Sequence, residues 1–196
     1  MAGYHNDQSN PNAAIPVWLA GGNAANLTTN TYSQVKVGIG VLSGLVVGVA
    51  GTSSAVTFYD GTSSVVTITI AAPGVISWAG HPFVPGNAVV FETTGALPTG
   101  LTAGTKYYVS TVGLTANAFS VADTAAHALA GTNTVTTTGT QSGVHTAWNV
   151  SVPVGPLSTT AQATLPLGVN GWMFSSGLIA STTASGGAAG LIILYR

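Results

Sequence analysis

Cysteine is absent from the 196 residues of the chain. Without thiols the chain cannot form disulfides, a thiolate zinc site, a cysteine-ligated iron-sulfur cluster or a cysteine nucleophile. The stability of the fold must therefore come from side-chain packing and from association with other chains.

Charged side chains are also scarce. Three Lys/Arg and four Asp/Glu make up 4% of the residues and leave a net charge of -1, whereas an ordinary soluble domain has about 25% charged residues. Lys36, Lys106 and Arg196 are too few to neutralise a phosphate backbone, so we expect no nucleic-acid partner. The mean hydropathy of +0.47 is too high for a disordered chain. Because interface cores are depleted of charge, the composition favours a chain that works in an assembly.

No apolar run is long enough for a membrane-spanning helix. The longest, Val37–Gly51, is shorter than the ~20 residues required and is interrupted by glycines. The first residues lack the basic start and apolar run of a secretory signal peptide. We therefore expect no membrane partner and synthesis in a cytoplasm.

Most of the chain has the pattern of short β-strands. Val35, Val37, Ile39 and Val41 alternate with small or polar residues and predict one half-buried strand. Similar short segments, rich in Thr, Ser and Val and bounded by Gly and Pro, follow to the end of the chain. These segments predict an all-β fold with strands at sandwich or barrel spacing. The predicted strands after the first are 55–59, 66–70, 74–78, 88–91, 105–110, 118–122, 134–138, 148–154, 161–167, 172–174 and 191–195.

The N-terminal residues 1–30 show no sustained periodicity and predict an extended arm. Four apolar residues form a short anchor within it, and such an arm usually docks onto its own body or a neighbouring subunit. The candidate anchor, to a larger assembly or to a neighbouring subunit, consists of Ile15, Val17, Trp18 and Leu19.

The groups available for acid-base or metal chemistry are few. The four carboxylates are spread over different predicted elements, so a glycosidase-like pair would require two of them to converge. Asp123 and His127 are four residues apart, in at most one short helical turn. His81 and His145 lie near opposite ends of the segment 64–146, which could bring them close together if that segment folds as one module. A metal site and ordinary structural histidines remain alternatives. We expect no catalytic, cofactor-binding or metal site among Asp7, Asp60, Glu92, Asp123, His5, His81, His127 and His145.

Large aromatic side chains recur in the middle of the chain. A small barrel of ~80 residues needs about this many large side chains to fill its interior. The alternative is that one of them is exposed and stacks on a carbohydrate. The residues concerned are Trp78, Phe83, Phe91, Tyr107 and Phe119.

The middle of the chain, about residues 64–146, resembles a small β module that recurs in tail, fibre and head-appendage proteins of tailed bacteriophages. The resemblance is carried by several motifs in the same order. They are Ile76-Ser77-Trp78, His81, Pro85-Gly86-Asn87, the turn Gly95-Ala96-Leu97-Pro98-Thr99-Gly100-Leu101, Tyr107-Tyr108-Val109, Ala118-Phe119-Ser120-Val121 and Gly143-Val144-His145-Thr146.

The flanking segments resemble a short β-sandwich of phage structural proteins with a YDG turn and a terminal YR strand. Here these are Tyr59-Asp60-Gly61 and Tyr195-Arg196. The two resemblances together imply a discontinuous, jelly-roll-like β-sandwich of residues 31–63 and 147–196. The barrel-like module 64–146 would be inserted into it just after the hairpin turn Asp60-Gly61.

These resemblances imply a non-enzymatic virion structural protein on the surface of a phage particle, without cofactors. We expect a capsid decoration or head-appendage (head-fibre) protein that binds the shell as a symmetric oligomer, with a trimer favoured. Its partners would be the major capsid protein or other virion proteins. The alternative is a tail or neck fibre segment that binds a host-surface glycan through the inserted module.

Overall fold

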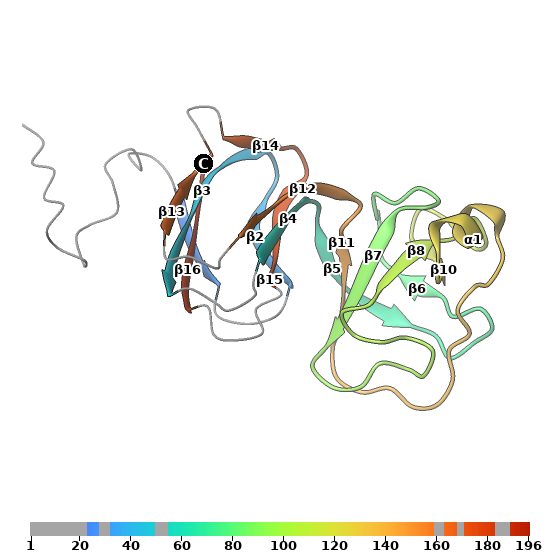
Figure 1. Ribbon diagram of the computed structural model, residues 1–196. Helices are drawn as coiled ribbons and strands as arrows, with labels where there is room; N and C mark the ends of the chain where they lie inside the picture. Colours follow the sequence, from blue (N-terminus) through green and yellow to red (C-terminus); the bar gives the residue numbers. More distant parts are fainter. Residues whose placement is uncertain (1–22, 28–31, 50–54, 159–162, 168–170, 183–188) are drawn as a thin grey trace, which may run out of the picture.

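The computed structural model of the chain describes residues 23–27, 32–49, 55–158, 163–167, 171–182 and 189–196. Within these residues the fold is nearly all β, and α1 (Ala125–Ala130) is the one α-helix. Figure 1 shows two bodies joined side by side, a sandwich that contains the C-terminus and a module that contains α1. All strand pairs are antiparallel.

The sandwich consists of two sheets, in the orders β1-β16-β3-β13 and β12-β4-β15-β2, with β14 also paired to β3. The pairs β1–β16, β2–β15, β3–β13 and β4–β12 nest inside one another along the chain, and β1, β2, β3 and β4 alternate between the two sheets. This is the arrangement of a jelly roll. The strands are β1 (Asn23–Leu27), β2 (Tyr32–Val37), β3 (Gly40–Val49), β4 (Ala55–Asp60), β12 (Val152–Ser158), β13 (Ala163–Pro166), β14 (Trp172–Phe174), β15 (Gly177–Thr182) and β16 (Ala189–Tyr195).

The core of the sandwich lies between the two sheets and is aliphatic and aromatic. Alternate residues of the strands point into it, which is why β4 buries Val56 and Phe58. Its buried members are Leu42, Leu45, Val47, Val56, Phe58, Phe174, Leu178, Ala180, Leu191 and Ile193.

The module is a seven-stranded sheet that nearly closes on itself, in the order β10-β8-β7-β11-β5-β6-β9. The two ends of this order, β9 and β10, are separated in sequence by Ser120 alone. The segment 118–122 therefore pairs with β6 through β9 and with β8 through β10, and so nearly closes the sheet. The backbone N–H of Ser110 donates to the carbonyl oxygen of Ser120 (2.9 Å) within this closure. The strands are β5 (Ser63–Ile68), β6 (Ile76–Ser77), β7 (Ala88–Thr93), β8 (Lys106–Val109), β9 (Ala118–Phe119), β10 (Val121–Ala122) and β11 (His145–Asn149).

The module occupies the tip of the β4–β12 hairpin. Val152 of β12 pairs with Asp60 of β4, and the whole module lies between these two residues in sequence. The all-β prediction, a jelly-roll-like sandwich with a barrel-like module inserted at a hairpin turn, is therefore confirmed. All of β5 and β11 belongs to the module sheet, so the chain changes sheets at Gly61-Thr62 and Val150-Ser151.

A third apolar cluster joins the module to the sandwich. It buries Tyr59 and Ile179 of the sandwich against Val90 and Trp148 of the module. The ring of Tyr32 lies 6.3 Å from that of Tyr59 and 6.1 Å from that of Trp148, centroid to centroid. Burial, followed by the neighbouring Tyr32, raises the pKa of Tyr59 to about 12. The junction is thus a packed apolar contact in which both bodies contribute aromatic rings.

Polar contacts supplement the junction. The carboxylate Oε1 of Glu92 in β7 accepts a hydrogen bond from the backbone N–H of Tyr32 in β2 (3.1 Å). The carbonyl oxygen of Ala88 accepts from the Val150 N–H and from the Ser151 hydroxyl, both at 3.1 Å. Buried apolar contacts and hydrogen bonds therefore both oppose rotation of the module relative to the sandwich.

Several strand predictions differ from the structure; for example, the expected strand 118–122 is divided into β9 and β10. The continuous strand expected through Val35–Val41 breaks at Gly38, whose φ is +78°, and β2 and β3 lie on either side of this turn. The expected strand 148–154 is divided between β11 and β12. The expected strand 134–138 forms isolated bridges, with Thr134 opposite Ala122 and Thr138 opposite Thr99.

Part of the predicted N-terminal arm belongs to the sandwich. Residues 23–27 form β1, which pairs with β16 along its whole length. The arm prediction for residues 1–22 and 28–30 lies outside the described residues, as do the anchor residues Ile15, Val17, Trp18 and Leu19.

Candidate functional site

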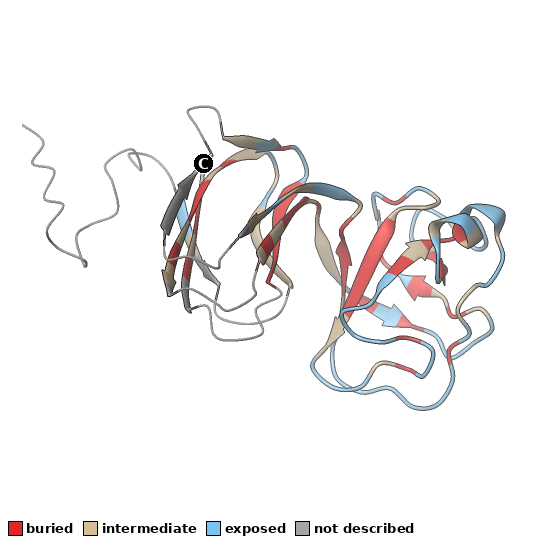
Figure 2. Cartoon of the chain, in the orientation of Figure 1, coloured by how far each residue is buried: buried red, intermediate tan, exposed pale blue. Residues whose placement is uncertain are grey.

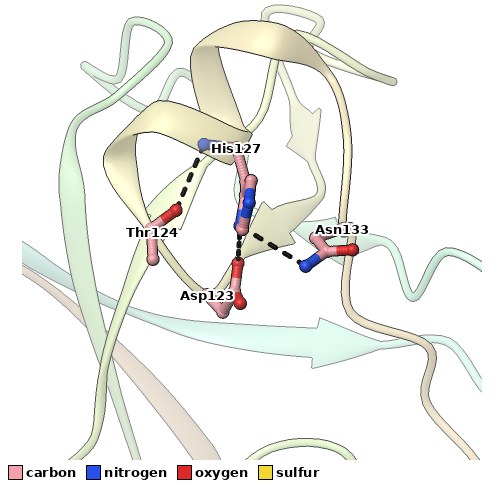
Figure 3. Close-up of polar contacts among 4 residues, drawn as sticks. All are labelled: Asp123, Thr124, His127 and Asn133. Atoms are coloured by element: carbon pink, nitrogen blue, oxygen red, sulfur yellow. Dashed lines mark hydrogen bonds and ion pairs between the residues drawn. The ribbon is translucent and has the colours of Figure 1, made fainter.

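The Asp123–His127 pair is the one ion pair found among the described residues. His127 Nδ1 lies 2.6 Å from Asp123 Oδ1, and the amide nitrogen of Asn133 lies 3.4 Å from the same ring nitrogen (Figure 3). The Thr124 hydroxyl accepts a hydrogen bond from the His127 backbone N–H (3.2 Å), so Thr124 is the N-cap of α1. Asp123 lies just before this cap, outside the helix, and its carboxylate contacts His127 in the first turn of α1.

This pair lies on the surface. The side chains of His127 and Asp123 are 42% and 53% exposed. The hydrogen bond from His127, opposed by partial desolvation, lowers the pKa of Asp123. The pair could exchange a proton or offer two metal ligands, but the described part of the chain contains no group of three His, Cys, Asp or Glu residues placed to hold a metal. The arrangement is best explained as stabilisation of the first turn of α1.

Asp60 is bound by backbone and side-chain donors of one turn. Its Oδ2 accepts from the Ser175 N–H (2.7 Å) and hydroxyl (2.8 Å), and its Oδ1 accepts from the N–H groups of Ser176 (2.7 Å) and Gly177 (3.2 Å). Burial opposes ionisation, but these hydrogen bonds outweigh it and lower the pKa of Asp60. Asp60 therefore fastens the β14–β15 turn to the end of β4.

The described carboxylates thus have separate structural partners. Asp60 binds the β14–β15 turn, Glu92 binds β2 at the junction, and Asp123 binds His127. No pair of them shares a contact, so the geometry offers no flanking pair of the glycosidase kind. Asp7 and His5 lie outside the described residues.

His81 and His145 have different surroundings. The ring of His81 packs against Phe83 and Phe119, and its Nδ1 accepts a hydrogen bond from the Phe83 N–H (3.3 Å). His145 is buried in β11, with Nδ1 2.8 Å from the Thr93 hydroxyl, and burial lowers its pKa. Their contacts suit structural histidines, and none of these contacts joins the two rings.

The five aromatic residues singled out in the module form its core. Trp78, Phe83, Phe91, Tyr107 and Phe119 are each at most 7% exposed and belong to one buried cluster. Among the described residues no aromatic side chain is classed as exposed. A carbohydrate-stacking platform on one of these five rings is therefore not present in this conformation.

Two shallow clefts lie beside the module. One, about 400 Å³, lies between the module and the sandwich and is lined by hydroxyl, apolar and amide side chains, namely Gln34, Val37, Thr62, Ser63, Ser64, Trp78, Pro82 and Ser176 with Gly80. The other, about 320 Å³, follows β5 and the segment 141–145. Neither is lined by a carboxylate, and the amide nitrogen of Gln34 in the first already donates to three backbone carbonyls.

The sandwich also exposes apolar side chains at one corner, which sequence reasoning did not find. Val37 and Ile39 flank Gly38 in the β2–β3 turn and are 75% and 67% exposed, and Met173 of β14 is 74% exposed. The Gly38 N–H donates to the Ser176 carbonyl (3.0 Å), which ties the β2–β3 turn to the β14–β15 turn. We call Val37, Ile39 and Met173 the apolar tip. The alternating pattern through Val41 placed Val37 and Ile39 on a buried face, and only the turn exposes them.

Searches of known proteins identify no relative: no protein-family model matches the chain, and no curated protein or solved structure matches it. No helix within the described ranges has the length and hydropathy needed to cross a bilayer.

Proposed function

We propose that the chain is a non-enzymatic virion structural protein of a tailed bacteriophage, a capsid decoration or head-appendage protein that binds the assembled shell as a symmetric oligomer, with a trimer favoured. The observation that carries the proposal is the architecture. A jelly-roll sandwich holds a second β module at the tip of one hairpin through a packed junction. This arrangement supports the two resemblances to phage structural proteins stated above.

The chemistry of the described residues agrees with a mechanical role. The carboxylates bind the protein's own backbone or a neighbouring histidine, and two of the histidines pack within the module. Such a protein would reinforce a shell through the area it buries and the number of copies bound, with few charged contacts. The partners in this proposal are further copies of the chain and the major capsid protein.

Cryo-electron microscopy of the purified particle tests the location. Density for the sandwich and module on the faces of the shell is expected. Density confined to the tail or neck would overturn the decoration role in favour of a fibre segment that binds a host glycan. Size-exclusion chromatography with light scattering of the isolated chain should show a multimer, and a monomer at micromolar concentration would contradict the oligomer.

The anchor can be tested by deletion, and the structure sets where the deletion must stop. Removal of residues 1–22 should abolish particle binding, whereas Asn23–Leu27 must remain because β1 pairs with β16. A matched variant, Trp18→Ser, keeps the length of the arm and should weaken binding. Unchanged binding by both variants would remove the anchoring role of the arm.

A further inference from the structure

The register of the first sandwich sheet places the start of β1 near the apolar tip. Asn23 pairs with Tyr195, Tyr195 pairs with Leu42, and Leu42 pairs with Trp172. One row across β1, β16, β3 and β14 thus begins at the first residue of β1 and ends beside Met173. Figure 1 shows this end of the sheet, with the C-terminus close to β14.

The distance across this row is short. Three strand spacings of about 4.8 Å separate β1 from β14, or about 14 Å. Leu19 precedes Asn23 by four residues, which span about 13 to 14 Å when extended. Gly21 and Gly22 lie between them and place few steric limits on the direction of the chain. The anchor residues of the same chain are therefore within reach of the apolar tip.

Composition supports the same pairing. The segment Ile15–Leu19 (the anchor segment) reads IPVWL and is flanked by small and polar residues. The three side chains of the apolar tip are aliphatic or thioether groups, and the described residues leave them exposed to solvent. Burial of one apolar set against the other removes both from water.

We propose that, in the free chain, the anchor segment covers the apolar tip of its own subunit. A segment tethered a few residues away has an effective concentration in the millimolar range, which exceeds that of a second copy at micromolar concentration. The anchor segment should therefore bind the apolar tip of its own chain in preference to that of a second copy, unless assembly adds further contacts between the two copies. The proposal concerns the isolated chain and does not depend on the virion role.

The absence of cysteine allows a direct test. In the double variant Val17→Cys/Met173→Cys, at low micromolar concentration, oxidation should give a disulfide within one chain, seen as a monomer on a non-reducing gel. Tethering alone could produce this product, so the matched control adds Val37→Ser and Ile39→Ser to the same double variant. These changes remove apolar surface and leave the tether intact, and they should slow disulfide formation about tenfold.

Two results of this experiment would overturn the proposal. Equal rates with and without the serine substitutions would mean that the tether alone brings the thiols together. Covalent dimers as the main product would mean that a second copy occupies the tip.

A second measurement leaves the anchor segment unchanged. A spin label on Met173→Cys, an exposed position, should broaden the amide resonances of residues 17–19. The same label on Val144→Cys, on an exposed residue of the module (50% exposed), serves as the control and should leave these resonances sharp. Sharp resonances with the label at position 173 would overturn the proposal, even if the double-cysteine variant failed to fold.

Discussion

Asp60→Asn should destabilise the sandwich, because the carboxylate of Asp60 accepts four hydrogen bonds from one turn. Asparagine keeps one carbonyl oxygen, so two of these donors would face an amide NH2 group that cannot accept them. Hydrogen bonds to a charged acceptor contribute about 1.5 to 3 kcal/mol each. Ser175 and Ser176 are exposed and water can replace part of the loss. We therefore take the low end and expect a loss of about 2 to 3 kcal/mol in unfolding free energy.

The effect of this substitution should depend on pH in a defined direction. The folded-state pKa of Asp60 lies below its ordinary value of 3.8, since the hydrogen bonds outweigh the opposing burial. The carboxylate therefore contributes its full stability above about pH 4, and this contribution is lost as the pH falls through the folded-state pKa. The difference between wild type and Asp60→Asn should be full near neutral pH and should shrink in acid.

Urea unfolding followed by tryptophan fluorescence, at a series of pH values, measures this difference. Trp172 packs against the sandwich core and Trp148 lies in the junction, so the emission reports both parts. Asp123→Asn is the matched control, because this carboxylate is exposed and its single contact, with His127, should contribute far less to the unfolding midpoint than the four hydrogen bonds of Asp60. The reasoning would be refuted by an Asp60→Asn effect that persists undiminished in acid, or by one as small as that of the control.

Two further predictions concern the module and its attachment. Gly61→Ala would place a Cβ against the carbonyl oxygen of Asn149, closer than the two atoms can approach, so the connection at Gly61-Thr62 must shift. We expect limited proteolysis between sandwich and module to become faster. An unchanged proteolysis rate would contradict this prediction. Burial lowers the pKa of His145, so the module keeps its full stability above about pH 6.5 and loses stability as the pH falls below that value. His145→Gln should reduce this acid sensitivity in thermal melts, whereas His127→Gln, at an exposed site, should leave it unchanged.

The strands that were predicted correctly are those with a clear alternating pattern and a turn residue at each end. The segment 55–59 is an example, since its inward residues Val56 and Phe58 are fully buried in the sandwich core. The strand β15 (Gly177–Thr182) was missed for the opposite reason. It lies between β4 and β2 and is buried on both faces, so its sequence GLIAST shows no alternation.

The breaks between strands were harder to predict than the strands themselves. Gly38 follows the same alternation as its neighbours, and only its left-handed φ reveals the turn that exposes Val37 and Ile39. Likewise, Trp148 and Val152 continue one period-two pattern but lie in different sheets. Periodicity records which side a residue faces locally, and does not say which sheet buries that side.

Of the candidate site residues, Asp123 and His127 were noted for their four-residue spacing around a short helical turn, and the structure places them in contact, although Asp123 precedes the helix. The partners of Asp60 and Glu92 were not predictable, because they are distant in sequence. Ser175 lies 115 residues from Asp60, and Tyr32 lies 60 residues from Glu92. The pairing of β15 with β4 in the jelly roll brings Ser175 to Asp60, and the packing of the module against the sandwich brings Glu92 to Tyr32.

The scarcity of charge and the placement of the described carboxylates have a common explanation. Asp60 holds the β14–β15 turn, Glu92 joins β7 to β2 at the junction, and Asp123 orders the start of α1. The sites of Asp60 and Glu92 are points where strands or sheets meet and where backbone N–H groups lack a partner in a ladder. An ionised carboxylate has two oxygens and can satisfy several such donors, as Asp60 does with four, whereas a hydroxyl has fewer lone pairs. Elsewhere hydroxyl groups suffice, for example Thr137, whose side chain bonds to the backbone of Thr69 and Ala71. The chain therefore keeps Asp60 and Glu92 where uncharged groups would leave backbone donors unsatisfied. Elsewhere its surface carries little charge that would repel another protein surface.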